Sequence, residues 1–465
     1  MLTKNIKKSL ILASVAIGLF SCRSMVEGYE NSPNSPTSVP AGVLLTSGQL
    51  ATAYLNGGEP TRIAGMWSGY FTGSDRQYLS YYAYDVNAGV FDDMWGNIYV
   101  EIITQARLSA EAADKAKNPI ISGIAKIIEA NAAGNAAALF GDIPFSETID
   151  ITKNPQPKFD AQADVYAGVQ KLLDDAIAKL SSGTGSVPND IFYGGNSAKW
   201  LKVAYTLKAR FFLHTASKNP ANYQLAYDAA LKGIDTSADD MIINYGGNQE
   251  KDQNIYYDFG QNNRQGYLTS DGAMAVKMLT EGQAMYRGNA KTDESMRKLF
   301  YYTSDGVDLN YTDGMFSATS PTPVVSYAEN ILILAETAAR LSNGKALEHL
   351  NSYRTWLSRK FSAKYDNYVA ADFATGGMDN KGGLTADQAL LKEILEERYI
   401  SFIGQLEGFN DLRRTFKDVV KISAPINKGA QFPQRYLYAQ AELNANAKAP
   451  KQTPTELFVA TPINK

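Results

Sequence analysis

The sequence predicts a mainly α-helical protein, with tetratricopeptide-like helix pairs in a superhelical bundle and long irregular loops rich in aromatic residues. Apolar residues recur at helical spacing in several long stretches, and no region has the pattern of a strand-rich fold. Short turns separate neighbouring helical stretches, which is typical of stacked helix pairs, although no clean repeat of about 34 residues is visible.

The N-terminus has the features of a secretory signal. Lysines precede an uncharged, mostly apolar run, Leu10 to Phe20, which is too short to cross a bilayer because that needs roughly 20 apolar residues. The only cysteine follows, and "LFSC" (19–22) resembles the lipobox of bacterial lipoproteins, whose cysteine carries lipid. We therefore expect residues 1–21 to be a lipoprotein signal peptide and Cys22 to be lipidated. A plain signal peptide that happens to contain a cysteine is the alternative.

The next segment is rich in Ser, Pro and Asn, which favours a flexible tether over residues 22–41. Beyond Cys22 no uninterrupted apolar run approaches membrane length. We expect residues 42–465 to form a single helical domain.

Five helical stretches follow in order. "ISGIAKIIEANAAGNAAALFGD" (121–142) begins with large apolar residues and ends in Ala and Gly, which predicts very close packing against a neighbour. Residues 164–180 and 197–214 each place apolar residues on one face, with Ser197 as the predicted N-cap. Residues 326–341 and 385–404 open with the capping-box patterns Ser326-x-x-Glu329 and Thr385-x-x-Gln388.

Two stretches break the helical pattern. Residues 54–99 and 244–327 combine many aromatic residues with Gly, Asn and Asp. Long loops in compact proteins are usually functional or disordered, and disordered segments are poor in aromatics. We expect both loops to be ordered.

Composition excludes several function classes. With one cysteine and two histidines, His214 and His349, the chain has no internal disulfide and little material for zinc sites or histidine-based catalysis. A net charge of −3 gives no general attraction to nucleic acid. We expect no cofactor and no resident metal ion.

Four stretches together resemble the SusD/RagB-like outer-membrane nutrient-binding lipoprotein family, and they follow that family's order over most of the chain. They are "ALFGDIPFSE" (138–147), "WLKVAYTLKARFFLH" (200–214), "ILEERYISFIGQLEGFNDLRRTF" (394–416) and "FPQRYLYAQAELNANAK" (432–448).

The resemblance implies a helical-bundle lipoprotein of the bacterial outer membrane, lipid-anchored and facing the cell exterior. It implies capture of a nutrient, glycan or peptide, for a SusC-like TonB-dependent barrel transporter, without enzymatic activity. Aromatic density favours an oligosaccharide over a peptide. Export to the outer face is associated with acidic residues just after the lipidated cysteine, and here the first is Glu27.

The aromatic loops supply the predicted ligand contacts. Tyr and Trp offer flat apolar faces and a hydrogen-bonding group, and neighbouring polar residues can bind hydroxyls or peptide backbone. The stretch "DRQYLSYYAYD" (75–85) fits a helix face poorly and is expected to be an exposed surface, whereas Trp95 is expected in the core. The predicted ligand-binding residues are Trp67, Tyr70, Asp75, Arg76, Tyr78, Tyr81, Tyr82, Tyr84, Asp305, Asp308, Asn310 and Tyr311.

Other polar residues are assigned structural roles. We expect Asp142 to hold the turn after a helix that ends at Gly141, with Pro144 keeping Ile143 extended. His214 lies on an apolar helix face and is expected in the core. Ion pairs that fasten helices are expected from Glu396, Glu397, Arg398, Asp411, Arg413 and Arg414.

Three alternatives remain open. An all-α glycoside hydrolase would also combine helices, aromatic loops and carboxylates, but no carboxylate pair stands out. A helical-repeat scaffold that binds only proteins would leave the aromatic loops without a role. Asp305, Asp308 and Asp313 could supply oxygen ligands to calcium, although their spacing does not follow an EF-hand.

Overall fold

The computed structural model describes residues 39–147, 154–249, 251–428 and 431–465. The expected signal peptide, the lipidation site Cys22 and almost all of the expected tether lie outside the described residues. From Ala41 onward the chain forms one compact unit. Within the described ranges, no helix is both long enough and apolar enough to cross a membrane.

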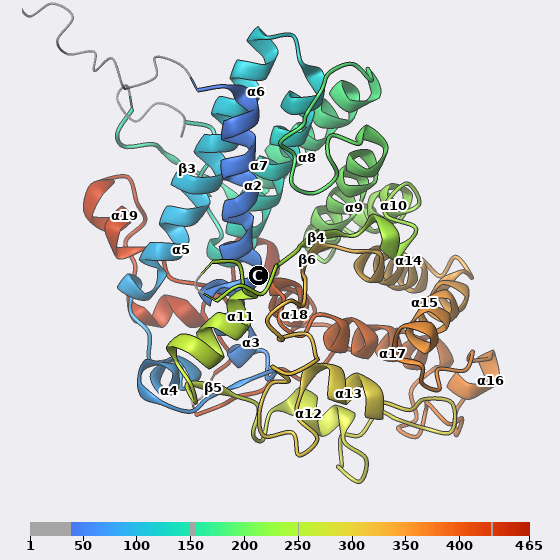
Figure 1. Cartoon of the computed structure of the whole chain (residues 1–465). Coiled ribbons are helices and arrows are strands. Elements are labelled where there is room, and N and C mark those ends of the chain that lie inside the picture. The colour runs from blue at the N-terminus through green and yellow to red at the C-terminus, as the bar shows by residue number, and fades with distance from the viewer. Residues whose placement is uncertain (1–38, 148–153, 250, 429–430) are drawn as a thin grey trace, which may run out of the picture. The chain divides into compact units, whose positions relative to one another are not determined.

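Stacked helices dominate this unit and confirm the predicted mainly α-helical class. The stack begins where α2 packs along α6 and α7, and it continues through α8, α9, α10, α14, α15 and α17 (Figure 1). Their bounds are α2 Ala41–Gly57, α6 Gln105–Lys115, α7 Pro119–Phe140, α8 Gln162–Ser181, α9 Ser197–Ala216, α10 Ala221–Ala230, α14 Tyr327–Leu341, α15 Ala346–Phe361 and α17 Ala386–Ser401. A π-helical segment, η2 (Asn97–Thr104), joins α5 (Asp92–Gly96) to α6, and α18 (Leu406–Arg414) follows α17.

Side-chain caps account for several helix starts. Thr385 and Gln388 form the predicted reciprocal capping box of α17. Ser326 caps α14 by accepting the backbone N–H of Glu329 at 3.2 Å. The N-cap predicted at Ser197 is wrong by one residue, because the side chain of Asn196 accepts the backbone N–H of Lys199 instead.

The small-residue half of α7 packs as closely as predicted. A Cβ atom added at Gly134 would lie 2.3 Å from Cζ of Phe211 on α9. The helix ends at Gly141, whose φ of 89° and ψ of −120° suit glycine but are not left-handed helical. The structural role of Asp142 is confirmed, since its Oδ1 accepts the backbone N–H of Gln162 at 2.8 Å and so holds the start of α8.

Short elements fill the connection between α10 and α14, which contains the second aromatic stretch. Three two-stranded antiparallel pairs link this connection and other loops to one another: β1 with β5, β2 with β3, and β4 with β6. The strands are β1 Thr72–Gly73, β2 Ile143–Pro144, β3 Phe159–Asp160, β4 Met241–Ile243, β5 Leu268–Thr269 and β6 Thr322–Val325. The short helices near them are α3 Glu59–Trp67, α4 Arg76–Tyr82, α11 Ile255–Tyr257, η4 Asp258–Asn263, α12 Met274–Leu279 and α13 Ser295–Tyr301.

The buried charges fasten helices, as expected. Glu336 of α14 accepts from Arg414 at 2.6 Å, and Arg398 pairs with Asp411 at 2.8 Å. Arg413 differs from the expectation because it donates to backbone carbonyls, including Ala138 at 2.7 Å, and has no ion pair among the described residues. His214 is buried as predicted, and its Nε2 lies 2.9 Å from Glu407.

Candidate functional site

The structure brings the two aromatic stretches together. Strand β1 pairs with β5, so that Thr72 lies opposite Thr269. The backbone N–H of Ser74 also donates to the carbonyl of Tyr267 at 2.9 Å. Helix α4 packs beside α3 and β1 (Figure 1), and Tyr256 of α11 donates to the Thr61 hydroxyl of α3 at 2.9 Å. Residues about 200 positions apart therefore share one surface.

The exposed loop predicted for residues 75–85 is corrected, because Arg76–Tyr82 form helix α4. Asp75 is its N-cap and accepts the backbone N–H of Arg76 at 2.9 Å. Asp75 and Arg76 are exposed, whereas Tyr78 is buried on the inner face. Tyr81 and Tyr82 are half-buried and keep accessible ring surface.

Four of the predicted contact residues, Trp67, Tyr70, Tyr78 and Tyr84, are core residues. Trp67, Tyr70 and Tyr78 are fully buried and Tyr84 nearly so. The indole of Trp67 donates to the carbonyl of Tyr81 at 2.8 Å, and the hydroxyl of Tyr70 donates to the carbonyl of Tyr399 at 2.7 Å. We correct the expectation for these rings, because they lack an accessible face on which a ligand could stack.

The polar residues of the second stretch mainly hold their own turn. Asp305 accepts from the Thr303 hydroxyl at 2.6 Å and from the backbone N–H of Val307. Asp308 accepts from the backbone N–H of Leu309, and Asn310 donates to Asp313 at 2.8 Å. In the described ranges, no three Asp, Glu, His or Cys side chains come together as metal ligands.

Arg62 lies at the centre of the residues that remain candidates for ligand binding. Its Nε donates to the hydroxyl of Tyr78 at 2.7 Å, and its guanidinium stands 4.1 Å above the ring of Phe259. Its Nη1 is buried yet finds no hydrogen-bond partner within the described residues. The Tyr311 hydroxyl is likewise buried and unpartnered there. Buried polar groups are normally satisfied, so these two are candidates for completion by a water molecule or by a ligand.

Glu59, one helical turn before Arg62, adds an acceptor. Burial raises the pKa of its carboxyl, and the positive charge of Arg62 opposes that shift without forming an ion pair. Burial raises the pKa of Tyr81, and the negative charge of Glu59 raises it further. Sequence reasoning missed Glu59, Arg62 and Phe259. Two opposite charges at i and i+3 within the first aromatic stretch were the available signal for Glu59 and Arg62.

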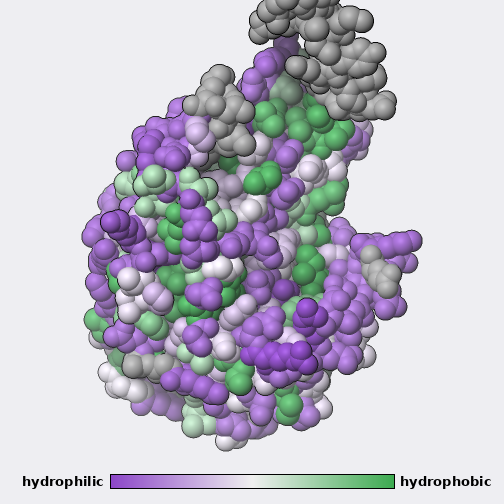
Figure 2. All heavy atoms as spheres, turned by 90° about the vertical axis from the view of Figure 1, so that its left-hand side faces the viewer, coloured by the Kyte–Doolittle hydropathy of each residue, from purple (hydrophilic) through white to green (hydrophobic). Residues whose placement is uncertain are grey.

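The surface on this side is mixed in character. Figure 2 turns the side that carries α4 and α5 toward the viewer, and hydrophobic patches lie there between larger hydrophilic areas. Ring faces, a guanidinium, a carboxylate and a hydroxyl are thus grouped around α3 and α4. We call Glu59, Arg62, Tyr81 and Tyr311 the Arg62 site, and the buried Tyr78 holds Arg62 in place.

Comparison with known proteins identifies relatives of the whole fold. Residues 33–439 match the model of the SusD-like family described as starch-binding and associating with the outer membrane. The comparison with curated proteins gave no match.

Solved structures agree with this family model. A SusD/RagB family protein from Bacteroides thetaiotaomicron VPI-5482 is similar at 21% identity over 88% of this chain and 95% of its own, with a TM-score of 0.65. A SusD-like protein from the same organism has 21% identity over 88% and 93%, with a TM-score of 0.67. A chitin-binding SusD homologue from Flavobacterium johnsoniae has 17% identity over 87% and 94%, with a TM-score of 0.62.

Proposed function

The chain belongs to the SusD-like family, and on that premise we propose that it is a cell-surface protein that captures a carbohydrate without transforming it. The family description names starch, and one structural relative is named as chitin-binding. The proposed contacts are those of the Arg62 site together with the neighbouring Tyr82, Asp75 and Arg76, with Asp305, Asp308 and Asn310 as the loop that positions Tyr311.

The observation that carries the proposal is the unsatisfied Nη1 of Arg62. We infer that a sugar hydroxyl accepts from this nitrogen, with the Glu59 carboxylate, which lies in the electrostatic range of Arg62, as a further acceptor for the ligand. Hydrogen bonds to charged groups contribute about 1.5–3 kcal/mol, because the desolvated donor is otherwise left without a partner.

Accessible tyrosine rings favour an oligosaccharide over a peptide. Stacking a sugar on one ring buries about 60 Å² of apolar area, which at about 25 cal/mol per Å² contributes about 1.5 kcal/mol. One such site binds weakly, and several repeats of a glycan chain gain by avidity. Tyr81 and Tyr82 are the rings of the predicted surface that keep part of their area exposed.

The proposal extends to location and partner. A lipid at Cys22 would hold the protein on the outer membrane, facing outward, where a SusC-like TonB-dependent transporter would receive the ligand. The interface between this protein and the transporter should bury well over about 2,000 Å² of surface to form a stable complex. Co-purification of a large barrel protein from native membranes in mild detergent tests this part.

Binding measurements test the carbohydrate site. With a panel of starch and chitin oligosaccharides, the double change Tyr81→Ala and Tyr82→Ala should weaken calorimetric binding about tenfold or more. Arg62→Gln should weaken it further, because it removes the unsatisfied donor together with the charge. Tyr205→Ala is the matched control, since Tyr205 is a half-buried tyrosine on α9.

The melting temperature separates the site from the core. It should stay nearly unchanged in the double variant, because both rings are only half-buried. A large drop would mean that these rings are core residues, and the site would be abandoned. Sustained release of shorter sugars during incubation would instead favour the glycoside hydrolase alternative.

A further inference from the structure

A pocket on another part of the unit carries a different set of groups. It has a volume of about 340 Å³ and is bounded by α13, α15, the β4–β6 pair and the segment Ser401–Gln405. A second hollow of about 670 Å³ adjoins it and shares Ser237, Asp240, Trp356 and Lys360. Both volumes fall within about 300–1,000 Å³, the usual size of small-molecule sites. None of the Arg62-site residues lines either hollow.

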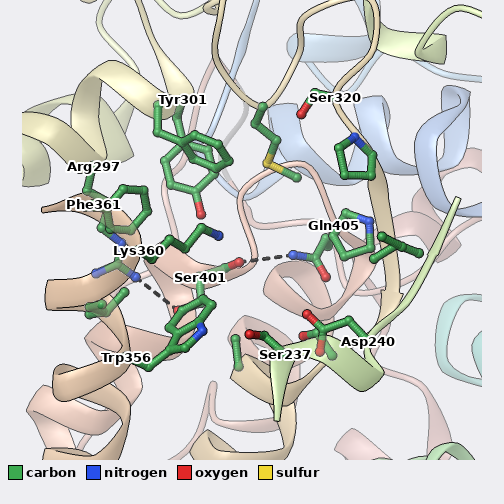
Figure 3. Close-up of a pocket in the computed structure, with 18 of the residues that line it drawn as sticks. Ser237, Asp240, Arg297, Tyr301, Ser320, Trp356, Lys360, Phe361, Ser401 and Gln405 are labelled. Atoms are coloured by element: carbon green, nitrogen blue, oxygen red, sulfur yellow. Dashed lines mark hydrogen bonds between the residues drawn. The ribbon is translucent and has the colours of Figure 1, made fainter. Parts of the chain in front are cut away.

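One side of the pocket is positive and aromatic. Figure 3 shows Lys360 reaching over Trp356, with Arg297 and Phe361 behind it. The Lys360 ammonium lies 4.8 Å from the ring centres of Trp356 and Phe300 and 5.3 Å from that of Phe361. It forms no hydrogen bond or ion pair within the described ranges, so its direct contacts are with ring faces.

The opposite side offers acceptors. Ser237, Asp240 and Gln405 lie there in Figure 3. Asp240 uses Oδ1 to accept the backbone N–H of Tyr327 at 2.6 Å, and Gln405 uses Nε2 to donate to the carbonyl of Ser401 at 3.0 Å. Their other oxygens, Oδ2 of Asp240 and Oε1 of Gln405, form no hydrogen bond with the part of the chain that the structure describes.

The two charges face one hollow without pairing. Burial raises the pKa of Asp240 to about 7, opposed by its hydrogen bond with Tyr327 and by Lys360. Burial also lowers the pKa of Lys360 to about 8, nearby Arg297 adds to that effect, and the charge of Asp240 opposes it. Each group therefore stabilises the charged form of the other only in part, without forming an ion pair with it. A ligand with only a negative charge would be repelled by Asp240. A ligand with only a positive charge would be repelled by Lys360 and Arg297.

We propose that this pocket is a second ligand site, for a free zwitterionic α-amino acid with an apolar side chain. The ligand carboxylate accepts from the Lys360 ammonium, and the ligand ammonium donates to Asp240 Oδ2 and Gln405 Oε1. The apolar side chain lies among Phe300, Met315 and Leu357 on the pocket wall. This site goes beyond the carbohydrate proposal and does not depend on it.

Three matched ligands test the charge requirement on the full chain by calorimetry. L-phenylalanine carries both charges, N-acetyl-L-phenylalanine lacks the ammonium, and L-phenylalaninamide lacks the carboxylate. Only L-phenylalanine should bind well, and each analogue should bind at least about tenfold more weakly, since each lacks one of the two charged hydrogen-bonding groups.

Variants test the two residues. Lys360→Met and Asp240→Asn should each weaken L-phenylalanine binding about tenfold or more, and Lys345→Met, an exposed lysine paired with Glu348, should not change it. Melting temperatures of the variants without ligand show that the fold is intact. Lys360→Met should leave oligosaccharide binding unchanged, and Arg62→Gln should leave L-phenylalanine binding unchanged. Equal binding of all three ligands, or no binding of L-phenylalanine up to about 10 mM, would overturn the proposal.

Discussion

Glu397 shows how single residues hold the helices in register. It lies on α17 and is fully buried, 2.7 Å from Arg297 of α13 and 2.8 Å from Arg287. Arg354 of α15 adds a third positive charge at 3.9 Å. Burial alone would raise the pKa of Glu397, but these arginines outweigh it and lower the pKa to about 2. The carboxylate is therefore a charged crosslink between segments that approach the proposed amino-acid pocket.

Removing this charge should destabilise the protein strongly. Glu397→Gln removes one buried negative charge from a group of arginines that are then left to share Glu294 and Glu393, so the free energy of unfolding should fall by about 3–5 kcal/mol. Urea unfolding followed by circular dichroism measures it. Glu111→Gln is the control, because Glu111 forms an exposed pair with Lys115 and such pairs contribute about 0–1 kcal/mol.

The same group predicts a pH dependence. Because folding lowers the pKa of Glu397, the ionised carboxylate stabilises the folded protein. This stabilisation is fully present above the unfolded pKa of about 4.5 and is lost as pH falls toward about 2. The wild type should lose stability faster than Glu397→Gln over that range. Parallel pH profiles of the two proteins would contradict the assignment.

Helix α7 shows how elements fit one another. Its C-terminal half is built of small residues, and Gly134 lets the ring of Phe211 on α9 approach the helix backbone. Close contact of this kind fixes the distance between two helices of the stack, because a packed interior gives little room for adjustment.

Gly134→Ala should therefore destabilise the protein despite the better helix propensity of alanine. The gain of up to about 1 kcal/mol from propensity is outweighed by overpacking, which costs about 1–3 kcal/mol. Gly96→Ala is the matched helical control, because a Cβ atom there meets nothing within 4 Å. Thermal unfolding should show a lower midpoint only for the change at Gly134. A raised midpoint would mean that Phe211 can move aside.

Periodicity and caps predicted α7, α8, α9, α14 and α17, because each buries one face on a neighbour, whereas α2 and α15 were not among the predicted helices. The sequence could not predict α4, since its seven residues include three tyrosines and only Tyr78 is buried. Strands of two residues, such as β1 and β5, carry no pattern, so the meeting of the two aromatic stretches was not foreseeable. For the same reason, Arg62 was not recognised as the centre of the site. Asp240 and Lys360 face one hollow only through tertiary packing.

At the scale of the whole molecule, the two proposed sites use different elements. The Arg62 site depends on α3, α4 and the loops near β5, and the amino-acid pocket depends on α13, α15 and the segment after α17. The two ligands should therefore bind independently, with each variant affecting one of them. Both sites lie on a unit that begins at Ala41, and the proposed lipid anchor precedes that unit in sequence.

Membrane attachment should depend on Cys22 alone. Each buried CH₂ group adds about 0.8 kcal/mol, so two or three acyl chains hold a protein on a bilayer almost irreversibly, whereas the described residues contain no membrane-spanning helix. Cys22→Ala should move the protein from the membrane pellet to the soluble fraction or leave its signal uncleaved, and Ser24→Ala should change neither. Mass spectrometry of the mature wild type should show loss of residues 1–21 and acyl mass on Cys22. A mature protein without acyl mass at Cys22 would remove the basis for surface anchoring, while both binding sites could still be tested in solution.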